Sequence, residues 1–253
     1  MKGLRRLLSY ARRACDDYEM IKDGDRIAVG VSAGKDSLSL LCTLAELRRF
    51  YPQKFDVVAI TVDMRFDEIG KPAADYKPIA ELCERLDVKY HVEPSNIAKI
   101  VFDVRKESNP CSLCAKLRRG AVNDTAKKLG CNKVALGHHF DDAVETFMLN
   151  LFFEGRIGCF SPVTYLDRTD ITVIRPLVYA PEKDVRYFAR SAELPVIESP
   201  CPADKDSERA EMKRLIASLE KQNKGLKHRI FGAMQRANID GYVESRLKNY
   251  DDE

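Results

Sequence analysis

Short apolar segments alternate with segments of helical spacing along most of the chain. Apolar, β-branched runs indicate buried strands at 26–31, 55–62, 88–92, 133–136 and 171–174. Between them, apolar residues recur every three or four positions, which predicts helices over 3–20, from 36, over 75–86, up to Gly130, after 142 and from 181. Nearly continuous apolar strands that alternate with helices are typical of an α/β fold, with a parallel sheet covered on both faces.

The segment that follows the helix after Asp142, and the apolar residues of that helix, also have predicted structures. Residues 154–170 contain Gly and Pro and are expected to form an irregular connection. An apolar stripe in the preceding helix is expected to pack in the core: Val144, Phe147, Met148, Leu151 and Phe152. We therefore divide the chain into a basic N-terminal helix (1–22), an α/β domain (23–200) and a charged helical segment (201–253).

The tight loop after the first strand has features that favour phosphate binding. It joins a strand end to a helix start, where exposed backbone N–H groups and the positive end of the helix dipole converge. It is not a Walker A loop, because Gly30 and Gly34 enclose three residues and Asp36 follows Lys35. The dinucleotide fingerprint of three spaced glycines is also missing. From the residues alone, an ordinary strand-to-helix turn remains the alternative to nucleotide binding.

This loop resembles the PP-loop of the ATP pyrophosphatases. The pattern S-G-G-x-D-S of that loop reads Ser32-Ala33-Gly34-Lys35-Asp36-Ser37 here. Ala33 replaces the first glycine, so we expect a φ angle below zero at this position. The resemblance implies a Rossmann-like parallel sheet with helices on both faces, of the PP-loop ATP pyrophosphatase or adenine nucleotide alpha-hydrolase-like type.

Further polar residues follow the ends of two predicted strands, at the edge where parallel sheets bind ligands. Asp63 ends the strand 55–62, and the strand 133–136 runs into Gly137-His-His-Phe-Asp-Asp142. Asp141 and Asp142 are hard oxygen ligands of the kind that magnesium prefers, although each is also a possible helix cap. His138 and the histidine after it are candidates to orient a nucleotide or act as an acid, with a packed histidine as the alternative.

Six of the eight cysteines separate into two groups, and the pattern around Cys131 and Cys159 is ambiguous. Cys15, Cys42 and Cys83 occupy apolar positions of predicted helices and are expected in the core. Three others stand apart: Cys111 and Cys114, at a spacing that reaches one metal site, and Cys201, between two prolines. Three thiolates suit a 4Fe–4S cluster with one iron lacking a protein ligand. On spacing alone, a redox pair or plain thiols compete with a cluster.

Composition and charge exclude several protein classes. The 253 residues are 45% hydrophobic, with a net charge of +3. No apolar run is long enough to cross a membrane, and the N-terminal helix lacks the apolar core of a secretory signal, so we expect a cytoplasmic protein. Basic residues cluster at 5–13, 116–119 and 213–236. Such clusters suit an anionic partner such as nucleic acid, while solvated helix faces are the alternative.

The motifs taken together resemble those of the tRNA 2-thiocytidine synthetase family. These are the PP-loop, Pro110-Cys-Ser-Leu-Cys-Ala-Lys-Leu-Arg-Arg-Gly120, the Gly137–Asp142 motif, and Ile174-Arg-Pro-Leu177 followed by Glu182-Lys-Asp184. The resemblance spans residues 20–235. It implies an enzyme that uses ATP, magnesium and a 4Fe–4S cluster to replace a base oxygen of tRNA, usually of a cytidine at position 32, by sulfur.

The resemblance also implies residue roles and partners. Catalytic roles fall to Lys35, Asp36 and Asp141, and the nucleotide site to Ser32, Ala33, Gly34, Lys35, Asp36, Ser37, Asp63, Gly137 and His138. Cys111, Cys114 and Cys201 are the implied 4Fe–4S ligands, and Asp141 and Asp142 the magnesium ligands. Expected partners are tRNA, a sulfur donor (sulfide or sulfur derived from a cysteine desulfurase) and a second copy of the chain in a homodimer. No membrane is expected.

The chain departs from this family at a second position besides Ala33. Many relatives carry another Cys two residues after the one matched by Cys201, whereas Ala203 and Asp204 follow here. Two other functions remain as alternatives. A ligase of the lysidine-forming type would use the same ATP activation without a cluster, and a non-catalytic iron–sulfur RNA sensor would need no phosphate loop.

Overall fold

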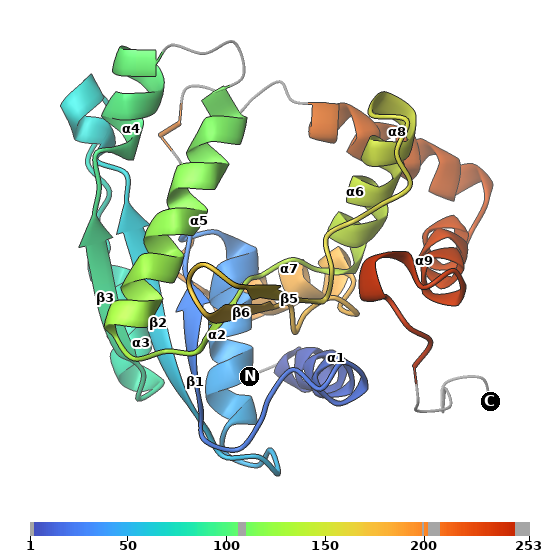
Figure 1. The fold of residues 1–253 in the computed structure, drawn as a ribbon, viewed down its shortest axis with the longest axis horizontal. Coiled ribbons are helices and arrows are strands. Elements are labelled where there is room, and N and C mark those ends of the chain that lie inside the picture. Colours follow the sequence, from blue (N-terminus) through green and yellow to red (C-terminus); the bar gives the residue numbers. More distant parts are fainter. Residues whose placement is uncertain (1–2, 106–109, 199, 202–207, 246–253) are drawn as a thin grey trace.

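The apolar runs form one six-stranded sheet, in the order β3-β2-β1-β4-β6-β5, in a computed structural model of the chain (Figure 1). The strands are β1 (Asp25–Gly30), β2 (Phe55–Asp63), β3 (Lys89–Pro94), β4 (Lys133–Ala135), β5 (Val163–Leu166) and β6 (Ile171–Ile174). All neighbours pair in parallel except β5, which is antiparallel to β6. The α/β fold with a parallel sheet is therefore confirmed.

The structure describes residues 3–105, 110–198, 200–201 and 208–245. The predicted departure at Ala203 and Asp204 lies outside them. The helices are α1 (Leu4–Asp17), α2 (Lys35–Leu47), α3 (Lys77–Arg85), α4 (Ile97–Lys99), α5 (Pro110–Lys128), α6 (Phe140–Phe153), α7 (Glu182–Ser191), α8 (Glu208–Gln222) and α9 (Leu226–Arg236). Short 3-10 turns, η1 (Phe66–Ile69) and η3 (Ile239–Gly241), and a π-helical turn, η2 (Ile100–Arg105), complete the fold. None of these described helices is long and apolar enough to cross a membrane.

Strand residues alternate between two buried layers, one on each face of the sheet. Ile27 and Val29 of β1 pack with α1, α2 and α7, whereas Ala28 between them packs against Ala126 of α5 on the other face. This alternation follows from the pleat, which points successive side chains to opposite faces. The sheet is buried on both sides, as its nearly continuous apolar strands predict.

The two ends of the described chain belong to the same hydrophobic core as the sheet. Leu7 of α1 and Phe231 of α9 are both buried in the larger cluster. The arginines of α1 also contact the domain: Arg6 forms an ion pair with Asp184, and Arg13 lies 4.4 Å from the ring centre of Tyr179. The predicted segments 1–22 and 201–253 thus contribute side chains to the core of the central segment.

Two expectations for residues 144–170 were wrong. The connection 154–170 is not wholly irregular, because Val163–Leu166 forms β5 at the edge of the sheet. Four residues, three half-buried and Tyr165 exposed, give too weak an alternation of apolar and polar positions to reveal such an edge strand. The stripe in α6 is not all core either: Val144 is buried, but Leu151 is 39% and Phe152 59% exposed. The apolar stripe extends past the point where neighbouring elements cover the helix.

Candidate active site

The site lies where the order of the sheet reverses. The chain leaves β1 in one direction toward β2 and crosses to the other side to form β4, so the loops after β1 and β4 face each other across the sheet edge. The contact between the two loops is tight. A Cβ atom on Gly137 would lie 2.9 Å from the carbonyl carbon of Asp36 and 3.0 Å from the nitrogen of Ser37. Only glycine fits at this position.

The loop between β1 and α2 is closed by its own serines. The Ser37 hydroxyl accepts a hydrogen bond from the backbone N–H of Ser32 at 3.1 Å and donates one to the carbonyl of Gly34 at 3.0 Å. Among the described residues, no side chain caps the start of α2, whose N-cap residue is Gly34. The first N–H groups of the helix therefore lack side-chain partners and form a site suited to an anion.

The backbone at Ala33 corrects the expectation of a negative φ. Its φ angle is 63°, in the left-handed region that glycine occupies without strain. The conformation is held from outside the loop, since the Ala33 carbonyl accepts a hydrogen bond from the N–H of Ile197 at 3.0 Å. Alanine is the smallest residue with a Cβ atom, and here it adopts the left-handed conformation despite the steric cost in free energy.

A cleft of about 680 Å³ opens beside this loop. Eight of the predicted site residues line it: Ser32, Ala33, Asp36, Ser37, Asp63, Gly137, His138 and Asp142. Its other walls include Arg118 and Arg119 of α5 and the buried Arg175. The cleft thus joins a phosphate-type loop, two carboxylates at helix starts and several arginines, an arrangement that suits a polyanionic ligand with a metal ion.

The two histidines of the Gly137–Asp142 motif have different roles. His138 packs against the ring of Phe160 at 4.8 Å, and its Nδ1 atom is buried without a hydrogen-bond partner among the described residues. Burial, with the nearby Arg175 and Arg209, lowers the pKa of His138 to about 3. His138 is therefore neutral near pH 7 and cannot supply a proton as imidazolium there.

His139 instead caps α6. Its Nδ1 accepts a hydrogen bond from the Asp142 N–H at 3.3 Å, while the Asp142 carboxylate accepts one from the His139 N–H at 2.9 Å. The Nε2 atom of His139 faces Asp36 at 3.7 Å. The ring therefore lies between the two cleft carboxylates and fixes their separation.

Asp141 and Asp142 also differ, although they are adjacent. Asp142 lines the cleft, with Arg209 at 3.4 Å. Asp141 does not line it and is hydrogen-bonded inside the fold, accepting from the N–H of Glu182 and from the Nζ of Lys227, each at 2.6 Å. Both of its carboxylate oxygens are already used in joining α6 to α7 and α9. The magnesium and catalytic roles predicted for Asp141 thus have no support in this geometry.

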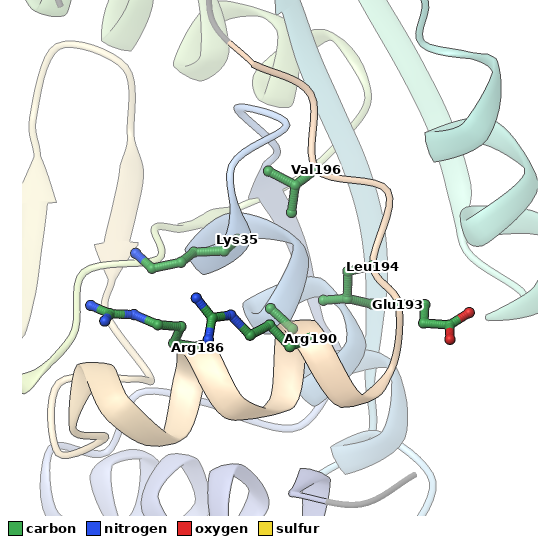
Figure 2. Close-up of a pocket in the computed structure, with 7 residues that line it drawn as sticks. Lys35, Arg186, Arg190, Glu193, Leu194 and Val196 are labelled. Atoms are coloured by element: carbon green, nitrogen blue, oxygen red, sulfur yellow. The ribbon is translucent and has the colours of Figure 1, made fainter.

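Lys35 points away from the large cleft. Its ammonium lies 2.9 Å from Asp36 and 3.3 Å from Glu182. Figure 2 shows it beside Arg186 and Arg190 of α7, around a smaller pocket of about 400 Å³. Gly34 lines neither of the two pockets, and Lys35 is the residue of the predicted loop that lines the smaller one. A phosphate contact by Lys35 requires its side chain to leave the two carboxylates.

The three selected cysteines converge around the N-terminal end of α5. Cys111 and Cys114 are among the first five residues of this helix, and Cys201 follows Pro200, which lines the cleft together with Ala115. Burial raises the pKa of Cys114, Arg118 lowers it, and the charges of Cys201 and Cys111 raise it further. The Cys114 sulfur is thus within electrostatic reach of both other cysteines. No group of three or more His, Cys, Asp or Glu that could hold a metal ion occurs among the described residues.

Two residues of the site had no assigned role in the sequence analysis. Arg175 is buried, lies over Phe160 at 5.0 Å, and has an Nε atom without a hydrogen-bond partner among the described residues. Glu182 accepts ion pairs from Lys35, Arg186 and Lys213, and these cations lower its pKa to about 2 against the effect of burial. Arg175 and Glu182 both belong to motifs that support the family resemblance, and these motifs are the sequence signal that could have identified them.

Comparisons with known proteins show the family to which the chain belongs. The PP-loop domain family matches residues 7–219. A tRNA-cytidine(32) 2-sulfurtransferase of Geobacter sulfurreducens is 43% identical over 225 residues, which cover 88% of this chain and 86% of that protein. This chain belongs to the PP-loop family of tRNA-cytidine(32) 2-sulfurtransferases. The 2-sulfurtransferase of Geotalea daltonii is 40% identical over 251 residues, covering 97% of this chain and 96% of that one.

A solved structure extends the comparison beyond these 2-sulfurtransferases. The U34-tRNA thiolase NcsA of Methanococcus maripaludis, solved with its 4Fe–4S cluster, superposes with a TM-score of 0.73 at 26% identity. The match covers 95% of this chain and 80% of that chain. The family and the fold predicted from the motifs are therefore confirmed.

Proposed function

We propose that this protein is an ATP-dependent tRNA sulfurtransferase that replaces the C2 oxygen of a cytidine by sulfur. The curated relatives are named for cytidine 32 of tRNA, which makes this base the proposed substrate. One observation carries the proposal: the PP-loop, Ala115 and Pro200 line the same cleft. ATP chemistry and the cysteines next to Ala115 and Pro200 would therefore act on one bound base.

The loop and the start of α2 would hold the phosphates of ATP. The uncapped N–H groups of α2 and the hydroxyl of Ser32 would be the donors, while the Ser37 hydroxyl, which donates to the Gly34 carbonyl, would keep the loop closed. Gly34 supports this role: its φ of −83° is ordinary, and a Cβ there would lie 3.5 Å from Ser32 Oγ. The fold itself therefore does not require glycine at this position, but the close approach of a phosphate would. Lys35 would then exchange Glu182 for phosphate, and Asp63 would border the nucleoside at the far side of the cleft.

Asp36 and Asp142 fit a magnesium ion. Magnesium is usually bound by one or two carboxylates together with water and substrate phosphates, so a site without three protein ligands is compatible with it. When bound, the ion would neutralise charge on the phosphates of ATP. His139 would keep the two carboxylates apart, and Asp141 would position α6 through Lys227 and Glu182.

The chemistry follows from the poor leaving ability of a base oxygen. The C2 oxygen of the cytosine would attack the α-phosphorus of ATP, the bond to the bridging oxygen would break, and pyrophosphate would leave. Sulfide would then add to C2, and AMP would depart with the original oxygen. Arg118, Arg119 and Arg175 line the cleft and would stabilise the negative charge that develops in both steps.

Cys111, Cys114 and Cys201 fit a 4Fe–4S cluster. Each iron of a cluster takes its own thiolate, so the ligands stand farther apart than ligands of a single ion, consistent with the lack of a single-ion site. Burial raises the pKa of Cys114, and the nearby Arg118 opposes this rise by favouring the thiolate. When bound, a cluster with three protein thiolates would supply one iron that is open to an external sulfide. The NcsA structure supports this proposal through its own cluster.

The stoichiometry of the reaction tests this proposal. Anaerobically prepared protein, ATP, magnesium and unmodified tRNA would be incubated with sulfide in one arm, and with cysteine and a cysteine desulfurase in another. We expect one AMP and one pyrophosphate per 2-thiocytidine formed, all dependent on tRNA. Asp36→Ala should abolish all three products, and Lys35→Ala should weaken ATP binding. Release of ADP and phosphate, or tRNA-independent hydrolysis without thiolated nucleoside, would contradict adenylation of the base.

A further inference from the structure

The last turn of α6 exposes large apolar side chains that the proposed chemistry does not use. Leu151, Phe152 and Phe153 are 39%, 59% and 49% exposed, and Ile157 just after the helix is 67% exposed. This end of the helix is not frayed. Asn150 is buried and donates to the Gly158 carbonyl at 2.8 Å, which folds the following loop back onto the helix. The exposed rings are therefore presented on a fixed support.

The side chains of this turn point in different directions. Successive residues of an α-helix are rotated by about 100°, so the three exposed residues do not share one face. Phe153 shares a face with Leu149, Thr146 and Asp142, at spacings of four, seven and eleven residues. Asp142 lines the cleft, so a row along α6 runs from the cleft to Phe153, about 16 Å away.

A half-exposed cation lies over this row. Arg209 of α8 lies over its middle, donating to Thr146 at 2.9 Å and contacting Asp142 at 3.4 Å, with its side chain 47% exposed. Arg118 and Arg119 line the cleft from α5, and all three arginines are thus available to RNA phosphates. An aromatic ring near such cations is typical of sites that bind single-stranded nucleic acid.

We propose that Phe153 is a stacking platform for an unpaired base of the RNA substrate, a few nucleotides from the base that enters the cleft. This inference rests on the proposed function. A base that enters the cleft must leave its stack, and a protein ring can replace the contact that its neighbours lose. A distance of about 16 Å corresponds to about five nucleotides at the 3.4 Å spacing of a stacked strand, which fits within one RNA hairpin loop.

The patch suits RNA better than a second copy of this chain. With about 200 Å² for each large side chain, the four exposed residues offer roughly 400 Å², whereas a stable dimer buries about 800 Å² per partner. The divergent directions of the three helix residues also leave no flat apolar face. An exposed ring on a row that also carries Arg209 fits a single base with its phosphate.

A tryptophan at position 153 gives a direct test, because the chain contains no tryptophan. In Phe153→Trp, titration with unmodified tRNA should quench the one tryptophan signal, and binding should remain as tight as in the wild type. Phe153→Ala should raise the Kd for tRNA about 5-fold to 150-fold with unchanged ATP affinity. Phe153→Leu should behave like Ala, since it keeps apolar area but lacks a ring face. Leu151→Ala, on another face of the same turn, is the matched control and should bind as the wild type does.

The outcomes separate this inference from the proposed function. If the wild type forms 2-thiocytidine but Phe153→Ala binds tRNA normally, or Phe153→Leu restores binding, the stacking role is overturned and the enzyme assignment stands. If Phe153→Ala converts a dimer to a monomer in light scattering, the patch is an interface between copies. Wild-type protein that neither binds nor thiolates tRNA would overturn both proposals. Circular dichroism confirms in each case that the variant is folded.

Discussion

Substituting Gly137 tests the contact between the two loops of the site. A methyl group there would lie 2.9 Å from the Asp36 carbonyl carbon and 3.0 Å from its oxygen and from Ser37 N, closer than real Cβ contacts. These are backbone atoms, so no rotamer change relieves the clash, and the PP-loop must move by about 0.5 Å to reach an ordinary contact. Overpacking of this kind costs about 1–3 kcal/mol of unfolding free energy. Because misplacement by about 1 Å can cost 100-fold in rate, we expect Gly137→Ala to lower kcat/KM roughly 10- to 100-fold.

The assay combines thermal unfolding with tRNA thiolation kinetics. For a chain of this length, the expected loss corresponds to a drop in Tm of about 2–12 °C. Gly120→Ala is the matched control: it lies within α5, and a Cβ there meets no atom within 4 Å. It should raise stability by about 0.5–1 kcal/mol and keep the activity. Gly137→Ala with wild-type Tm and kcat/KM would show that the two loops do not constrain each other.

Three further perturbations address the loop, a buried carboxyl and the arginines. Ala33→Gly should change the free energy of unfolding by less than about 1 kcal/mol. Relief of the left-handed strain, worth about 1–2 kcal/mol, is offset by the loss of a buried methyl group and by the greater freedom of the unfolded chain. Ala33→Val should lower the free energy of unfolding, measured by chemical denaturation, by about 2 kcal/mol or more. Burial raises the pKa of Glu145 from 4.5 to about 7, so between these pH values the folded state keeps a proton that the unfolded state releases. The free energy of unfolding should therefore fall as the pH rises from 4.5 to 7 in the wild type, and fall less in Glu145→Gln. Identical pH profiles of the two proteins would refute this. Charge reversal of Arg118 and Arg119 should weaken tRNA binding. The slope of log K against log salt concentration should become shallower by about 0.7–0.9 for each phosphate contact that is lost. An unchanged slope in a filter-binding titration would assign both residues to the solvated surface.

The parallel sheet could be predicted from the sequence, because strands and helices differ in the period at which apolar residues recur. The position of the site was also predictable, since the residues after the parallel strands β1 and β4 must lie at the same edge of the sheet. Eight predicted residues accordingly line one cleft. These are consequences of topology, which short-range patterns determine well.

Side-chain direction within a motif was not predictable. Asp141 and Asp142 are adjacent, but a helix start turns them about 100° apart, so one reaches Lys227 and the other the cleft. His138 and His139 precede α6, where the extended backbone at His139 turns adjacent side chains in different directions. The φ of Ala33 depends on a hydrogen bond from Ile197, 164 positions away, which no local pattern encodes. The exposure of Phe152 likewise depends on where neighbouring helices end.

The role of the three cysteines is tested most directly by replacing Cys201 and measuring thiolated nucleosides together with bound metal. Cys201→Ala should bind less iron and form no 2-thiocytidine by nucleoside mass spectrometry, because the cluster loses one of three thiolates. Cys42→Ala, at a buried position of α2 away from the cleft, should keep both iron and activity, as should Cys83→Ala in α3. Both outcomes together would support sulfur transfer at a cluster held by Cys111, Cys114 and Cys201. Full thiolation by Cys201→Ala, or stoichiometric zinc in place of iron in the wild-type protein, would contradict it.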